Sequence, residues 1–111
     1  MTIVSDDTVS KALSYLADDP HPFALAKKDA LDAETNAKTI FARLMLASTQ
    51  TSVATKEADA TQDPDYLEAK ANESAAIFEL ERHRRRTAAA ETLISVWQSE
   101  GKIIRTAEKV R

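Results

Sequence analysis

Residues 26–58 read AKKDALDAETNAKTIFARLMLASTQTSVATKEA. Within this stretch ten positions follow one another at alternating steps of four and three residues, and all but one are apolar. These positions are Ala26, Ala30, Ala33, Ala37, Ile40, Leu44, Ala47, Thr51, Ala54 and Ala58. Such a heptad stripe predicts a long helix that packs against a partner helix, and its many alanines allow the partner's backbone to come close.

A second heptad stripe occurs later in the chain. Its positions are Tyr66, Ala69, Glu73, Ala76, Leu80, His83, Thr87, Ala90, Ile94 and Trp97. Folding the two helices in antiparallel places large residues of one stripe against small residues of the other, which fills a seam without voids. The predicted facing pairs are Trp97 with Ala26, Ile94 with Ala30, Ala90 with Ala33, Leu80 with Leu44, and Ala69 with Ala54. The two stripes together predict a long antiparallel helical hairpin of the coiled-coil type.

Capping and helix-breaking residues indicate a short N-terminal helix before the hairpin. Ser5 and the two aspartates that follow it are candidate N-caps for a helix over residues 6–18, because their side-chain oxygens accept from first-turn amides. Pro20 and Pro22 then interrupt the helical pattern. Pro22 is also well suited to the first turn of the next helix.

The hairpin arms are expected over residues 23–58 and 65–100, within a single all-α domain of residues 1–111. Asp63 and Pro64 fit an N-cap followed by a proline at the first helical position of the second arm.

Gly101 is the only glycine of the chain, and we expect it to form the left-handed C-cap of the second arm. Residues 102–111 then form a basic tail. Two alternatives stay open for this tail: it extends the helix, or it orders on a partner.

Apolar residues outside both stripes need a further covering surface. These are Phe41, Met45 and Leu46 in the first arm and Ile77, Phe78 and Leu93 in the second. We therefore expect a homo-oligomer, formed by dimerisation into a helical bundle or a longer coiled assembly. A three-helix monomer, in which the short first helix covers part of this surface, is the alternative.

The composition excludes several classes of protein. One glycine cannot build a phosphate-binding loop, and the absence of cysteine excludes disulfides and thiolate metal sites. Asp6 and Asp7 stand where a signal peptide carries bases, and no stretch approaches the roughly 18 apolar residues of a membrane span. We therefore expect a cytoplasmic protein without a membrane partner.

The chain offers little catalytic chemistry. Of its two histidines, His21 lies in the proline-rich break, where we expect it to be solvated, and His83 lies one turn after Glu79. This pair does not make a metal site, because helical di-metal proteins use two Glu-x-x-His motifs and further inward glutamates. We expect Glu73 and Thr51 to form a buried polar pair that sets the helix register. The chain is therefore predicted to be no enzyme and to carry no cofactor and no metal.

Charge is distributed unevenly along the chain. Residues 82–111 carry a net charge of +5, whereas residues 1–81 carry −8. This asymmetry suits an acidic partner, or pairing of acidic and basic ends in an antiparallel oligomer. The bases expected to bind nucleic acid are Arg82, Arg84, Arg85 and Arg86, with Lys38 and Arg43 at the same level across the hairpin, and Lys102 and Arg105 in the tail. A solvated face held by ion pairs such as Glu81 with Arg85 is the alternative.

The end of the second arm reads AAAETLISVWQS over residues 88–99 and is followed by the basic tail. This pattern resembles small helical proteins of phages and prophages that are encoded beside recombination and replication genes. Those proteins tend to have a long hairpin, a tryptophan with a polar pair and a short basic end. The resemblance implies a phage origin, work near DNA in the cytoplasm of a bacterial host, and no catalytic residue.

Two hypotheses for function follow. In the first, the protein is a non-enzymatic accessory factor of a phage or prophage that binds nucleic acid through the arginines and the basic tail. In the second, it is an adaptor or inhibitor that binds another protein through its helical surface, with the arginines in intersubunit ion pairs.

Overall fold

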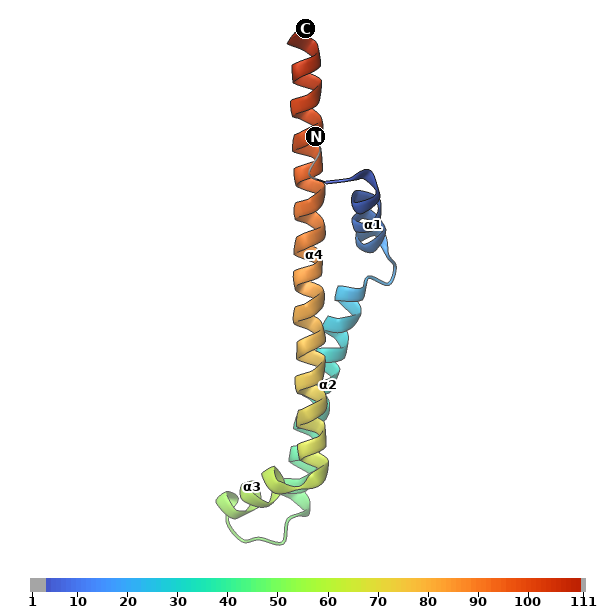
Figure 1. Cartoon of the computed structure of the whole chain (residues 1–111). Helices are drawn as coiled ribbons and strands as arrows, with labels where there is room; N and C mark the ends of the chain where they lie inside the picture. Colours follow the sequence, from blue (N-terminus) through green and yellow to red (C-terminus); the bar gives the residue numbers. More distant parts are fainter. Residues whose placement is uncertain (1–3, 111) are drawn as a thin grey trace. The chain divides into compact units, whose positions relative to one another are not determined.

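The computed structural model describes residues 4–110, which form four helices and no strand (Figure 1). The helices are α1 (Asp6–Ala17), α2 (Pro22–Ala47), α3 (Val53–Gln62) and α4 (Pro64–Val110). The predicted all-α class is confirmed, and α2 forms the predicted antiparallel hairpin with the first part of α4. Within this described part of the chain, no helix is both long and apolar enough to pass through a membrane.

The helices begin where caps and prolines predict. Ser5 Oγ accepts a hydrogen bond from a first-turn amide of α1 at 3.2 Å. Helices α2 and α4 begin at Pro22 and Pro64, where the missing N–H of proline has no helical partner to lose. Asp63 Oδ1 accepts from the Asp65 N–H at 2.9 Å, which confirms the predicted cap of α4.

The prediction of one helix over residues 23–58 is wrong in its second half. Helix α2 ends at Ala47, a non-helical segment follows, and α3 begins after Ser52. The segment between the two helices contains only Ser, Thr and Gln, whose side chains compete with the helix for backbone hydrogen bonds. Ser48 Oγ accepts from the Gln50 N–H at 3.2 Å, and Ser52 Oγ caps α3 at the same distance.

The predicted end of the second arm at Gly101 is also wrong. Helix α4 continues through Gly101 to Val110, and no described glycine has a positive φ. A glycine inside a helix costs about 1 kcal/mol relative to alanine, which is too little to stop a helix that is hydrogen-bonded on both sides. Of the two alternatives for the basic tail, the structure therefore shows the helical extension.

The described chain divides into two compact units that share α4. The first unit combines the described residues up to Phe23 with those from Arg82 onward, so it contains α1 and the C-terminal part of α4. The second unit, Ala24–Glu81, contains most of α2, all of α3 and the beginning of α4.

Both units are built on the predicted heptad stripe of α4. Every stripe residue from Tyr66 to Ile94 is buried or partly buried. In the first unit Ala90 packs with Ala12 and Tyr15 of α1. The buried residues of the second unit are all alanines: Ala26, Ala30 and Ala37 of α2, Ala60 of α3, and Ala69 of α4.

The predicted facing pairs are wrong, although the stripe that carried them is right. In the second unit Phe41 contacts Tyr66, with ring centroids 5.4 Å apart, because α2 ends early and pairs with an earlier part of α4. In the first unit Ile94 packs against the Ala12 cluster, and the Trp97 Nε1–H donates to Asp6 Oδ1 at 3.1 Å. Helix α1 therefore packs against the stripe residues that were predicted to face the start of the first arm.

Candidate functional site

The predicted arginine cluster lies on α4 in the first unit, and part of it packs on aromatic rings. The guanidinium carbon of Arg86 lies 4.2 Å from the centroid of the Tyr15 ring. That of Arg84 lies 6.0 Å from the centroid of the Phe23 ring. Both geometries allow cation–π attraction, so these two arginines help to hold the first unit together. Arg82 and Arg85, like Arg84 and Arg86, are exposed.

The expectation that Lys38 and Arg43 reach the level of this cluster is wrong. Lys38 lies in a groove with Tyr66 and Lys70, and its Nζ forms an ion pair with a carboxylate one turn earlier on α2. Arg43 lines a separate hollow with Asp65. These three α4 residues precede the arginine cluster, because α2 pairs with the beginning of that helix.

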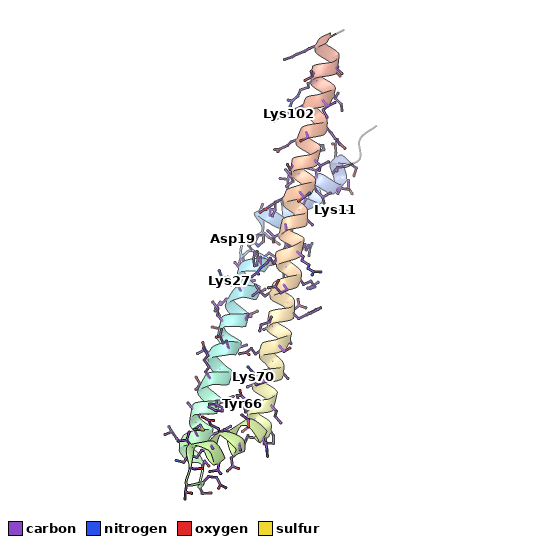
Figure 2. All side chains as sticks on the ribbon, turned by 90° about the vertical axis from the view of Figure 1, so that its left-hand side faces the viewer. Lys11, Asp19, Lys27, Tyr66, Lys70 and Lys102 are labelled. Carbon is purple, nitrogen blue, oxygen red and sulfur yellow. The ribbon has the colours of Figure 1, made fainter. Side chains whose placement is uncertain are left out.

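The other two predicted bases, Lys102 and Arg105, lie on the C-terminal extension of α4 in the first unit. Lys102 is labelled on this extension in Figure 2. Both bases are exposed and border a hollow that also includes Trp97 and Ile104. The first unit therefore holds six of the eight predicted bases, all on α4.

A hydrogen-bonding network centred on Tyr15 joins α1 to α4. The Tyr15 hydroxyl lies 3.2 Å from His83 Nδ1 and 3.3 Å from Thr87 Oγ1. The His21 ring meets the Tyr15 ring edge-on, at 5.0 Å between centroids. His21 Nδ1 also accepts from the Phe23 N–H at 3.1 Å, so this ring supports the start of α2 and is not the solvated side chain that was expected. The network sets the position of α1 on α4.

The second unit contains an open groove between α2 and α4, with a volume of about 690 Å³. Its apolar residues are Ala30, Leu31, Ala37 and Phe41 of α2, and Tyr66, Ile77 and Leu80 of α4. Charged residues border it: Lys27, Glu34 and Lys38 of α2, and Lys70 and Glu73 of α4. Figure 2 labels Lys27, Tyr66 and Lys70, which belong to this set. We call this feature the α2–α4 groove.

Ion pairing orders the rim of the α2–α4 groove. Lys70 Nζ donates to Glu73 Oε1 at 2.7 Å, and this hydrogen bond, together with the charge of Glu73, raises the pKa of Lys70 above its ordinary 10.5. The predicted buried pair of Glu73 with Thr51 is therefore wrong: Glu73 is paired along its own helix, and Thr51 is exposed after the end of α2.

Sequence reasoning missed the α2–α4 groove and the role of Tyr15. Leu31 lies one position after the stripe residue Ala30, so a heptad analysis treats it as outward-facing. Nothing in the sequence around Tyr15 shows that its hydroxyl meets His83 on α4. The available signal was the presence of apolar residues outside the stripe, which indicates that a second surface exists without locating it.

Among residues 4–110, no three His, Cys, Asp or Glu side chains gather in a way that could hold a metal ion. Comparison of the chain with protein-family models, with curated proteins and with solved structures finds no match.

Proposed function

We propose that this protein is a non-enzymatic interaction protein that binds an amphipathic helix of another protein in the α2–α4 groove. One observation carries the proposal: apolar side chains stay open to solvent between two helices whose buried contacts are alanines. Leu31 is 55% exposed and Ile77 is 47% exposed, and both line the groove. An incoming helix that covers such residues gains about 25 cal/mol for each Å² of apolar surface removed from water.

The charged rim adds selectivity. Lys27 and Lys38 stand on the α2 side, and the paired Lys70 and Glu73 stand on the α4 side. An apolar centre with a charged border is the arrangement found where one protein docks on another. The partner helix is therefore expected to carry an apolar stripe flanked by an acidic residue that complements Lys27, since Lys38 already pairs with Glu34 on α2.

A selection experiment tests the proposed function. A display library of amphipathic helices is selected on the immobilised full chain, and the selected peptides are measured by fluorescence anisotropy against variants. Leu31→Lys places a charge in the groove and is expected to weaken binding about tenfold or more. Leu67→Lys is the matched control, because Leu67 is equally exposed at 55% and does not line the groove. Peptides that bind the Leu31→Lys variant as well as the original chain, or an empty selection, contradict the proposal.

The charge of α4 favours a second candidate function, binding of nucleic acid by an accessory protein of a phage in its bacterial host. Arg85, Lys102 and Arg105 are exposed on α4, where they are able to neutralise several phosphates. The resemblance of residues 88–99 to phage proteins supports the same role.

An oligonucleotide titration tests this second function. Labelled single- and double-stranded DNA are titrated with protein at two salt concentrations. Affinity that falls steeply with salt, and falls further with Arg85→Glu but not with Lys28→Glu on α2, supports it. No binding at low salt contradicts it.

A further inference from the structure

A small hollow lies between α1 and α4 in the first unit, with a volume of about 240 Å³. Its apolar lining consists of three alanines and Leu93, beside Tyr15. Its other lining residues are Thr8, Lys11 and Arg86, and no aspartate or glutamate of the described chain lines it. We call this feature the α1–α4 hollow. It belongs to the first unit, whereas the α2–α4 groove belongs to the second, so an inference drawn from it goes beyond the proposed function.

The Arg86 guanidinium is held in place without the use of its hydrogen-bond donors. It lies 4.2 Å from the centroid of the Tyr15 ring. Tyr15 is 7% exposed, and its hydroxyl contacts His83 and Thr87. Within residues 4–110 the Arg86 guanidinium makes no hydrogen bond and no ion pair, so all its N–H groups remain available. A positioned guanidinium favours an oxygen-rich anion, because its planar fork binds two oxygens side by side.

Helix α1 supplies the other two donor groups of the α1–α4 hollow. Lys11, labelled in Figure 2, has its Nζ 3.2 Å from Asp7 Oδ2, and the two side chains are 79% and 78% exposed. An exposed pair of this kind contributes little to stability, so Lys11 can leave it for an anion in the hollow at small cost. The Thr8 hydroxyl shares a hydrogen bond of 2.8 Å with Ser5 Oγ, in which either oxygen can donate. When Ser5 donates, the Thr8 hydroxyl keeps its own proton for an anion.

We propose that the α1–α4 hollow binds a phosphate group through Arg86, Lys11 and Thr8. These donors come from two helices and line one hollow, and a phosphate presents enough oxygens to meet all of them. A carboxylate has only two oxygens, which the guanidinium fork alone satisfies. The contact of Tyr15 with His83 joins the two sides of the site before the anion arrives, which lowers the ordering cost of binding. The phosphate belongs to a nucleic acid or to a small free phosphate compound, and the experiment separates these sources.

Titration of the full chain with inorganic phosphate tests the site. Nuclear magnetic resonance of backbone amides and arginine Nε–H groups is recorded while phosphate is added at constant ionic strength. The Arg86 Nε–H signal is expected to shift and to saturate at millimolar phosphate. Acetate at the same ionic strength is expected to bind about tenfold more weakly. An Arg86 signal that does not shift with phosphate, or that shifts equally with acetate, overturns the proposal.

Substitutions separate this site from the general positive charge of α4. Lys11→Gln and Arg86→Gln are each expected to weaken phosphate binding about tenfold, as followed at the Thr8 amide. Arg85→Gln is the matched control, because Arg85 is exposed on the same helix and does not line the hollow. Lys11→Gln removes no contact of Tyr15, so it tests the site even where Arg86→Gln loosens α1. An equal loss in Arg85→Gln shows attraction by overall charge alone and overturns the proposal.

Three ligands identify the source of the phosphate: inorganic phosphate, a nucleoside monophosphate and a single-stranded oligonucleotide. Oligonucleotide binding that weakens in Lys11→Gln and is displaced by inorganic phosphate assigns the hollow to nucleic acid. Oligonucleotide binding that is unchanged in Lys11→Gln, while that variant loses the nucleoside monophosphate, assigns it to a small phosphate compound. Leu31→Lys in the α2–α4 groove should bind phosphate as the original chain does, so failure of the proposed peptide binding and failure of this site are distinguishable.

Discussion

The two units use one heptad stripe of α4 in different ways. In the first unit α1 is held by Tyr15, whose hydroxyl meets His83 and Thr87 and whose ring lies under Arg86. In the second unit α2 is held by alanine contacts and a single ring contact, between Phe41 and Tyr66. Directional polar contacts set a helix in one position, whereas alanines bring two helices close and leave larger side chains outside the seam. In the second unit the larger side chains left outside the alanine seam line the α2–α4 groove.

Of the predicted losses of stability, the loss caused by replacing Tyr15 should be the largest. Tyr15→Ala is expected to lower the free energy of unfolding by about 3 kcal/mol, because it removes a buried ring together with its hydrogen bonds. Tyr15→Phe should cost about 1 kcal/mol, since only the hydroxyl contacts are lost. Urea unfolding followed by Trp97 fluorescence measures both losses, because the Trp97 indole N–H donates to Asp6 of α1. Tyr66→Ala in the second unit should cost less than Tyr15→Ala, as Tyr66 is only partly buried; an equal cost would contradict the contrast.

Enlarging an alanine tests the close contact of the second unit. Ala69 is 2% exposed, so Ala69→Leu should force α2 and α4 apart and cost about 1–3 kcal/mol. Ala75→Leu is the control, because Ala75 is exposed on the same helix and tolerates a larger side chain. Thermal unfolding by circular dichroism compares them. Equal melting temperatures for the two variants would show that the α2–α4 seam is not closely packed.

The two serine caps offer a matched pair of substitutions, one in each unit. Ser5 and Ser52 each accept from the amide three residues later at 3.2 Å, and each pairs with a threonine hydroxyl at 2.8 Å. Ser5→Ala and Ser52→Ala should therefore each cost about 1 kcal/mol. Hydrogen exchange shows where the cost falls: Ser5→Ala should expose amides of α1, and Ser52→Ala those of α3. If either substitution reduces protection from hydrogen exchange in both units, the two units open together.

The smallest expected effect is a loss of stability at alkaline pH, confined to the second unit. Hydrogen bonds to Glu73 and Asp32 raise the pKa of Lys70 and Lys28 above 10.5 in the folded chain. A raised lysine pKa stabilises the fold fully below pH 10.5, and this contribution disappears as the pH rises through the folded pKa. Both lysines are exposed, so the effect is small. The urea concentration at the unfolding midpoint should fall more between pH 9 and about 12 in the original chain than in a Lys28→Gln, Lys70→Gln double variant. Equal falls in the two proteins would contradict this prediction.

Local chemistry predicted most of the helix ends. Ser5, Pro22 and the Asp63-Pro64 pair work as their residue types indicate, because a cap or a proline acts within one turn. The end of α2 was not predicted, because residues 48–52 contain no glycine or proline. The heptad stripe also continues through them, although Ser48 hydrogen-bonds to nearby backbone in the structure. Gly101 was misassigned because a glycine near a predicted end resembles a cap, whereas α4 continues past it.

The candidate site was less predictable than the fold. The basic residues of α4 stand on one helix, so sequence spacing places them together. The predicted positions of Lys38 and Arg43 depended on the predicted register of α2 against α4, and both were wrong because that register was wrong. The α2–α4 groove arises only when Leu31 and Ile77 line the same hollow, and no spacing along the chain predicts that juxtaposition.

By itself the sequence determined that the chain is helical, where α1, α2 and α4 begin, and which face of α4 is buried. These properties follow from periodicity and from interactions within a turn or two. The tertiary structure alone decided which helix covers each part of that face: α2 packs along the beginning, and α1 packs along residues around Ala90. A heptad stripe shows that a helix face is covered but not which helix covers it, because an alanine seam can pack against many helices. In this chain the hydroxyl of Tyr15 and the early end of α2 decide between α1 and α2 as the covering helix.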